Sequence, residues 1–196
     1  MRSKNWLQRH NEDIYVKKAK IEGYQSRSAF KLIEIENKFQ IISKSKQILE
    51  LGSAPGGWSQ VLCEKSKKAL IYSFDLNHMK YRNKQIKFYQ KNFMEFNFQA
   101  LAIKYDLILS DISPNLIGHK KTDHLRMITV AEEVIYIMKK FIKKDGNFVI
   151  KIFKGSEDKM IINNLKAIFK KVSFFKPKSS RIESSEIFII ALGYVG

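Results

Sequence analysis

Short apolar runs alternate with longer amphipathic segments along most of the chain. Apolar or alternating runs bounded by turn residues predict strands at Gln47–Leu51, Leu70–Leu76, Ile86–Tyr89, Tyr105–Ser110, Phe148–Phe153, Val172–Lys176 and Glu186–Leu192. Helical spacing of apolar residues predicts helices over Ser28–Lys38, Gly57–Lys67, Thr122–Phe141 and Glu157–Lys170. A turn is predicted at Lys144–Asn147, where a lysine precedes the residues Asp-Gly-Asn.

The order of these elements predicts an α/β fold. Strands that are separated by helices at this spacing form a parallel sheet with crossover helices on both faces. The last two strands have no helix between them, so we expect an antiparallel strand at the C-terminal end of a mostly parallel, seven-stranded sheet. Residues 1–26 are basic and contain scattered aromatic residues, which is typical of an appended arm or a short helix. Residues 27–196 are predicted to form one domain.

A glycine-rich turn follows the first predicted strand and opens a helix. It contains Gly52, Gly56 and Gly57, and small residues there let a ligand approach the backbone closely. The turn is neither a G-x-G-x-x-G fingerprint nor a phosphate-binding P-loop, because no lysine follows its last glycine. Asp75 ends the next strand, where a carboxylate can accept both hydroxyls of a ribose. Together these features favour a nucleoside without phosphates, such as S-adenosylmethionine, over a turn that only shapes the backbone.

The net charge points to a polyanionic partner. The chain has 36 basic and 19 acidic residues, which gives a formal charge of +17. Lysine and arginine gain affinity for nucleic acids through counterion release, so a nucleic acid is the favoured partner. A membrane partner is disfavoured, because no apolar run is long enough to span a bilayer and no basic amphipathic helix dominates.

Other features narrow the setting and the chemistry. The polar, basic start at Met1–Arg9 does not look like a secretory signal, and the single cysteine, Cys63, cannot form an internal disulfide. We therefore expect a cytoplasmic protein, with Cys63 packed in the core. The histidines show no metal-ligand spacing, so no metal site is expected.

Several motifs resemble the FtsJ/RrmJ family of ribosomal RNA 2′-O-methyltransferases. The strongest is the string Leu51-Gly-Ser-Ala-Pro-Gly-Gly-Trp-Ser-Gln60. Further matches occur in the same order along nearly the whole chain, at Ser26–Leu32, Ser110–Asn115, Phe148–Phe153, Lys176–Arg181 and Ser184–Phe188. The resemblance implies a Rossmann-like, S-adenosylmethionine-dependent methyltransferase fold.

The resemblance also implies the site residues. A Lys-Asp-Lys-Glu catalytic set falls on Lys31, Asp111, Lys151 and Glu186. With the glycine turn, the cofactor site would comprise Gly52, Gly56, Gly57, Trp58, Asp75, Asn92 and Asp111. One position departs from the family pattern, because Asn92 stands where an aspartate often meets the adenine. An asparagine carbonyl can still accept a hydrogen bond from the adenine amino group.

Lys151 is the catalytic candidate that a purely structural role explains least well. It lies within an apolar run, and a charged lysine is costly to bury unless it is paired. It could act as a base only if burial or the like charge of Lys31 lowered its pKa, whereas Asp111 and Glu186 favour the charged form. We therefore expect Lys151 either to remove the proton of the ribose hydroxyl or to steer its oxygen. Asp111 would orient Lys151, and Lys31 and Glu186 would position the ribose.

The implied substrate is a uridine ribose in the 23S RNA of the large ribosomal subunit. We expect a monomer, because no apolar surface stripe stands out in the sequence. The predicted RNA-binding residues are Arg2, Lys4, Arg9, Lys17, Lys18, Lys20, Arg27 and Arg181, with Lys176 and Lys178 as further candidates. A transfer RNA or messenger RNA cap methyltransferase would use the same catalytic set. A non-catalytic RNA-binding factor for ribosome assembly is the alternative from another class, and only the departure at Asn92 favours it.

Overall fold

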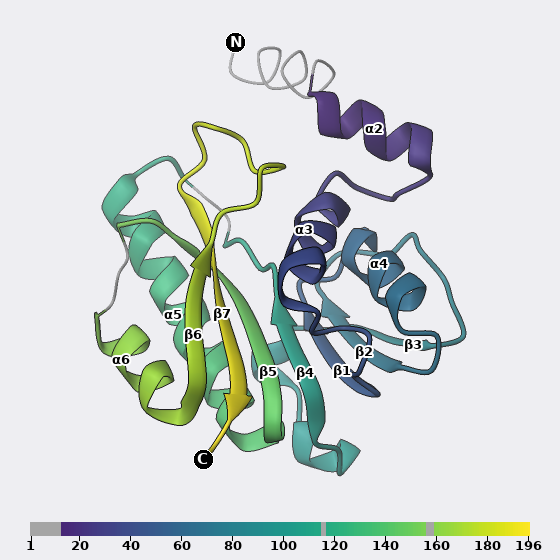
Figure 1. Ribbon diagram of the computed structural model, residues 1–196. Coiled ribbons are helices and arrows are strands. Elements are labelled where there is room, and N and C mark those ends of the chain that lie inside the picture. Colours follow the sequence, from purple (N-terminus) through teal and green to yellow (C-terminus); the bar gives the residue numbers. More distant parts are fainter. Residues whose placement is uncertain (1–12, 115–116, 156–158) are drawn as a thin grey trace.

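A single mixed sheet organises the molecule. The computed structural model describes residues 13–114, 117–155 and 159–196. The sheet has the strand order β3-β2-β1-β4-β5-β7-β6, in which β7 is antiparallel to both of its neighbours (Figure 1). The strands are β1 (Gln47–Leu51), β2 (Leu70–Asp75), β3 (Ile86–Gln90), β4 (Tyr105–Ser110), β5 (Ile142–Phe153), β6 (Phe169–Phe175) and β7 (Glu186–Tyr194). The predicted fold class, with its antiparallel C-terminal strand, is confirmed.

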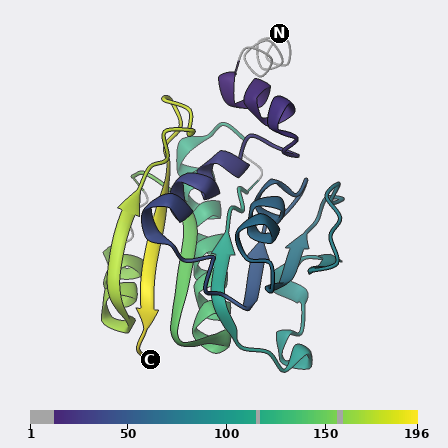
Figure 2. The ribbon, with the colours of Figure 1, turned by 45° about the vertical axis from the view of Figure 1, so that its right-hand side comes forward.

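Helices cover both faces of this sheet. The α-helices are α2 (Ile14–Glu22), α3 (Ala29–Phe39), α4 (Gly57–Lys65), α5 (Lys120–Phe141) and α6 (Lys159–Ile168), and two short 3₁₀ helices are η1 (Phe93–Glu95) and η2 (Phe98–Leu101). In Figure 1, α3 and α4 lie in front of the strands and α5 lies behind them, and the rotated view of Figure 2 separates these layers.

Alternation along the strands divides the core into two clusters. On β1, Ile48 packs with α3 and α4, whereas Leu49 and Leu51 pack with α5. On β5, Val149 belongs to the cluster that packs with α3 and α4, and Ile150 belongs to the cluster that packs with α5. Because successive side chains of a strand point to opposite faces, a strand that is apolar at every position is buried on both sides. This is why the central strands are continuous apolar runs rather than alternating ones.

Several predicted boundaries were wrong by a few residues, and the two largest errors concern the starts of β5 and β6. The turn predicted at Lys144–Asn147 lies inside β5, which begins at Ile142 and changes its register with β4 after the pair Tyr105–Ile142. Asp145 adopts a φ of 60° at this irregularity, so the turn-forming residues make a bulge rather than a break. The helix predicted to reach Lys170 ends at Ile168, since Phe169 pairs with Tyr194 and stacks on Phe148 as the first residue of β6.

The described part of the predicted N-terminal arm contains the helix α2. Asp13 caps this helix by accepting the backbone N–H of Tyr15. Val16 and Ala19 are buried against the domain, while Ile14 and Ile21 are exposed. Figure 1 shows α2 at the same end of the molecule as the loop between β6 and β7.

Candidate active site

A cavity of about 480 Å³ opens where β1, β2 and β4 end. In parallel α/β sheets, ligands bind at this edge of the strands. The predicted cofactor residues Gly52, Asp75, Asn92 and Asp111 all line the cavity. Each of these residues follows or ends a different strand, so the topology brings together four positions that are far apart in the sequence.

The glycine turn needs its glycines for steric reasons. Gly52 has a φ of +81°, and a Cβ atom there would lie 2.8 Å from Cγ1 of Ile112 on the cavity wall. Gly56 has a φ of +114°, and its Cβ would lie 2.5 Å from that of Tyr81. Both backbone conformations are strained for residues with a side chain. The turn is held by Asp75, whose Oδ2 accepts the backbone N–H of Ala54 at 2.8 Å.

Three predicted cofactor residues are not among the residues that line the cavity. Gly56 and Gly57 are buried at the start of α4. Trp58 is 2% exposed, and its indole N–H donates to the backbone oxygen of Ser28 at 2.9 Å. In this structure Trp58 therefore ties α4 to the start of α3, and direct contact with a cofactor stays a prediction for these three residues.

Sequence reasoning missed a buried carboxyl group beneath the turn. Glu50 on β1 is 1% exposed, and its Oε2 accepts hydrogen bonds from Ser59 at 2.6 Å and from Ser73 at 2.7 Å. Burial raises its pKa to about 7, although the two hydroxyl groups oppose the shift. Glu50 therefore joins β1, β2 and α4. A glutamate after the apolar residues Ile48 and Leu49, two residues before Gly52, was the available signal.

The raised pKa of Glu50 predicts a specific dependence of stability on pH. Because the folded pKa of about 7 exceeds the ordinary glutamate value of 4.5, the folded state binds this proton more tightly than the unfolded state. The free energy of unfolding should therefore fall as the pH rises through that window, by on the order of 3 kcal/mol from this group. The variant Glu50→Gln cannot titrate and should lack this loss.

Denaturant unfolding of both proteins, from about pH 4 to pH 8, measures the difference. The stability of the wild type minus that of Glu50→Gln should decline through this range and then level off. A difference that stays constant with pH would contradict the assignment.

The four predicted catalytic residues form two adjacent ion pairs. Lys151 donates to the backbone oxygen of Asp111 at 2.8 Å, and its Nζ lies 3.1 Å from Oδ1 of the same residue. Lys31 donates to Oε2 of Glu186 at 2.8 Å. Burial alone would raise the pKa of Glu186, but the charge and hydrogen bond of Lys31 and the charge of Lys151 lower it below its usual value. The structure thus joins residues from α3, the end of β4, β5 and β7.

The cavity residues fit a nucleoside cofactor that carries an amino group. Asp111 lines the cavity, and its buried Oδ1 lies 3.1 Å from Nζ of Lys151, so a cationic amino group of the cofactor can share this carboxylate with the lysine. Asp75 has a carboxylate at the end of β2 for a ribose diol. Asn92 uses its Oδ1 for the N–H of Met94 and its Nδ2 for Glu95, so any contact of its oxygen with an adenine amino group must use a second lone pair.

The predicted RNA-binding residues fall into three groups. Arg2, Lys4 and Arg9 lie outside the described residues. Lys17, Lys18 and Lys20 are exposed on α2. Arg27 and Arg181 instead form ion pairs with Asp13, which sequence reasoning did not single out. Of the further candidates, Lys178 is exposed, and Lys176 donates to the backbone oxygen of Ser184 at 2.8 Å.

Three further observations concern other kinds of site. Within residues 13–114, 117–155 and 159–196, no group of three or more His, Cys, Asp and Glu side chains could hold a metal ion. In the same ranges, no helix has the length and apolar character needed to cross a membrane. Cys63 is 3% exposed and packs in the core cluster with α3 and α4, as predicted.

The fold and the cavity define a class of enzyme. A seven-stranded sheet with this strand order carries a glycine turn and an acidic residue after β2, beside a cavity suited to a nucleoside with an amino group. These features describe an S-adenosylmethionine-dependent methyltransferase. A model of the family described as FtsJ-like methyltransferase matches residues 24–194. The chain belongs to this family, whose methyl donor is S-adenosylmethionine.

Individual proteins that resemble this chain in sequence or structure agree with its assignment to this family. Ribosomal RNA large subunit methyltransferase E of Rickettsia felis is 43% identical to this chain, over 97% of the chain and 88% of the relative. The protein of the same name from a Wolbachia of Brugia malayi is 41% identical, over 98% and 89%. A crystal structure described as a ribosomal RNA methyltransferase from Plasmodium falciparum superposes with a TM-score of 0.79 at 32% identity, covering 88% of this chain and all of that one.

Proposed function

We propose that this enzyme transfers a methyl group from S-adenosylmethionine to the 2′-hydroxyl of a uridine ribose in 23S ribosomal RNA. The observation that carries the proposal is the pair of ion pairs, Lys151–Asp111 and Lys31–Glu186, with Asp111 itself lining the cofactor cavity. The names of the relatives support ribosomal RNA as the substrate, and ribose methylation requires RNA because only RNA has the 2′-hydroxyl.

The residues of the chain align and activate the ribose hydroxyl. The cofactor supplies a methyl carbon that its sulfonium already activates toward displacement. Asp111 holds the side-chain nitrogen of Lys151, and its carboxylate is also available to the amino group of the cofactor at the cavity wall. Lys151 then acts on the 2′-hydroxyl, either as a neutral amine that takes the hydroxyl proton or as an ammonium group that orients the oxygen. Lys31 and Glu186 position the ribose, and such alignment can lower the barrier by several kcal/mol.

The proposal extends to the RNA-binding surface and to the form in which the substrate is methylated. We place the basic residues of α2, together with Arg27 and Arg181, on the RNA backbone, where phosphate contacts give affinity rather than sequence choice. The substrate is ribosomal RNA within the large subunit, and the enzyme acts as a monomer in the cytoplasm.

The alternatives are less well supported. All four catalytic positions hold the expected residue types and meet in space, which disfavours a non-catalytic assembly factor. The names of the relatives disfavour transfer RNA and messenger RNA caps as substrates.

Methyl transfer to ribosomal subunits tests the proposal directly. Purified protein and labelled S-adenosylmethionine are incubated with large subunits from cells that lack this gene. Subunits from cells that have the gene, and bulk transfer RNA, serve as controls. We expect alkali-resistant label confined to one dinucleotide of the large-subunit RNA. Label on transfer RNA, or no label despite cofactor binding, would overturn the proposal.

A further inference from the structure

One carboxylate outside the catalytic set holds both candidate RNA-binding arginines. Oδ2 of Asp13 accepts a hydrogen bond from Arg27 and another, at 3.3 Å, from Nε of Arg181. Arg27 precedes α3, and Arg181 lies in the loop that leads into β7. Nη1 of Arg27 donates to Asp13, and Nη2 of Arg27 donates to the backbone oxygen of Ser179 in that loop. Asp13 thus bridges two arginines that are far apart in the sequence.

The arginine pair has the chemistry of a phosphate site. Guanidinium groups bind carboxylates and phosphates through the same parallel N–H donors, so an anion of either kind fits between two of them. Burial lowers the pKa of Arg27, the carboxylate of Asp13 raises it, and the like charge of Arg181 lowers it again. Two cations this close therefore favour an anion between them.

The site offers more hydrogen-bond donors than Asp13 uses. Nε of Arg27 and the hydroxyl group of Ser179 are buried and have no hydrogen-bond partner among the described residues. Buried polar groups are normally paired, so an unpaired donor on Arg27 and another on Ser179, whose backbone oxygen Arg27 binds, indicate an incomplete site. A phosphate has more acceptor oxygens than the single Oδ2 that Asp13 presents.

The location of the site ties it to the reaction. The carboxylate of Glu186 is close enough to Arg27 to raise the pKa of that arginine. Lys31 lies one helical turn after Arg27, and it pairs with Glu186. A phosphate bound by the arginines would therefore lie beside the residues that position the ribose.

The docking of α2 does not depend on the ion pairs of Asp13 alone. The rings of Tyr15 and Tyr24 pack on Phe30, with centroids 5.5 and 5.6 Å away. Val16 and Ala19 add buried apolar contacts. Oδ1 of Asp13 caps α2, whereas Oδ2 binds the arginines, so the two tasks use different atoms. The carboxylate can therefore release the arginines while the helix stays docked.

The geometry points to a self-inhibitory contact, in which Asp13 occupies the position of an RNA backbone phosphate between Arg27 and Arg181. This inference rests on the proposed function, because it takes RNA as the ligand. Binding of RNA requires the phosphate to displace the carboxylate, so the contact weakens RNA binding and disfavours poorly matched RNA. Asp13 is a competitor for the arginines rather than a contributor to the RNA surface.

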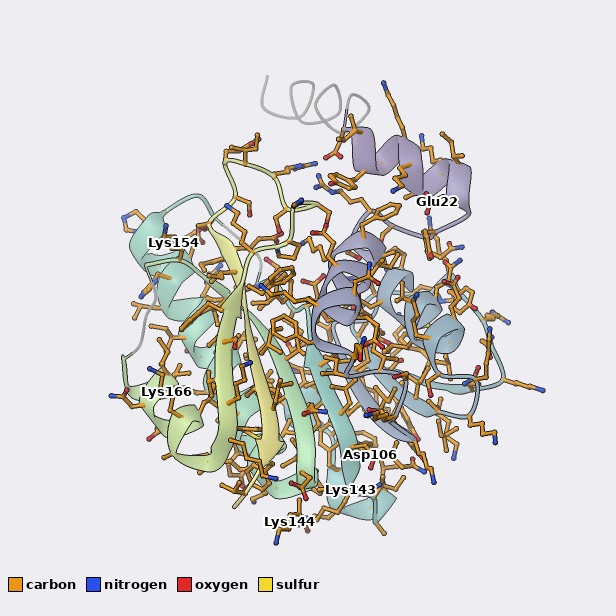
Figure 3. The ribbon with its side chains drawn as sticks, in the orientation of Figure 1. Glu22, Asp106, Lys143, Lys144, Lys154 and Lys166 are labelled. Carbon is orange, nitrogen blue, oxygen red and sulfur yellow. The ribbon has the colours of Figure 1, made fainter. Side chains whose placement is uncertain are left out.

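The variant Asp13→Asn tests the inference. Asparagine caps a helix as well as aspartate does. Its neutral amide has one carbonyl oxygen for the cap and no anionic oxygen for the arginines. Glu22→Gln is the matched control, since it removes one negative charge from the end of α2 (Figure 3). Among the described ion pairs, Glu22 pairs only with Lys18. Affinity for large-subunit ribosomal RNA is measured without cofactor at about 0.1 M salt, with melting temperatures to confirm folding.

We expect Asp13→Asn to bind RNA about three- to tenfold more tightly than Glu22→Gln does. The gain should shrink when Arg181→Gln is present in both proteins, because only Arg27 is then left for Asp13 to compete for. Equal or weaker binding by Asp13→Asn, or a gain that Arg181→Gln leaves unchanged, overturns the inference. Asp13→Ser, which also caps helices, repeats the test if the asparagine variant melts early.

The binding experiment separates this inference from the proposed function. If the wild type methylates ribosomal RNA but Asp13→Asn and Glu22→Gln bind alike, the inference fails and the function stands. If no protein transfers methyl groups but Asp13→Asn alone binds RNA more tightly, the function fails and the phosphate site stands.

Discussion

Methyl transfer is expected to fall by about 10²–10⁴-fold when Lys151 is replaced by methionine, because the hydroxyl loses the group that activates it. Lys151 is 5% exposed, and methionine has nearly the same shape, so the cavity should keep its outline. Single-turnover transfer to ribosomal RNA gives the rate, and calorimetry gives the affinity for S-adenosylmethionine. We expect the affinity to change by less than about threefold.

The chain offers a matched control for this variant. Lys143 and Asp106 also form an ion pair between β5 and β4, at 2.6 Å, near the opposite end of these strands (Figure 3). Lys143→Met therefore removes a similar pair from the same two strands while leaving the cavity untouched. Its transfer rate should match that of the wild type. If Lys151→Met and Lys143→Met are equally active, Lys151 has no catalytic role.

The strands could be predicted because burial on both faces leaves a plain signal. The strand Tyr105–Ser110 was predicted with the bounds that the structure shows, since its apolar run ends where polar residues begin. The start of β5 was not predictable from local preference. Lys144–Asn147 has the composition of a turn, but pairing with β4 holds it in the sheet as a bulge. Local propensity is a weak guide where tertiary pairing supplies the hydrogen bonds.

The site was predictable where the sequence carries a motif, and not where it depends on pairing. Lys31 and Glu186 are 155 residues apart, and only the family resemblance suggested that they act together. Their direct ion pair is visible only in the structure, because the fold brings α3 and β7 together. Asp13 was missed because one aspartate in a basic segment carries no signal, and its partners come from two distant loops. Glu50 is similar, because only the structure shows the two serine hydroxyls that bind it.

Replacing Asp75 by alanine is expected to weaken binding of S-adenosylmethionine by about 10²-fold, since charge-assisted hydrogen bonds to the ribose are lost. Asp75 also holds the glycine turn through the N–H of Ala54 and accepts the N–H of Asn77, so a weaker affinity alone would not identify the ribose contact. The ligand must therefore be varied as well as the protein.

A cofactor analogue without ribose hydroxyls separates the two roles of Asp75. Calorimetry with S-adenosylhomocysteine and with its 2′,3′-dideoxy form, on the wild type and on Asp75→Ala, completes a cycle between the side chain and the hydroxyls. If the carboxylate binds the diol, Asp75→Ala should weaken the first ligand by a much larger factor than the dideoxy form, which loses only what the turn contributes. If Asp75 only shapes the turn, both ligands should weaken by the same factor, because the turn is common to both complexes.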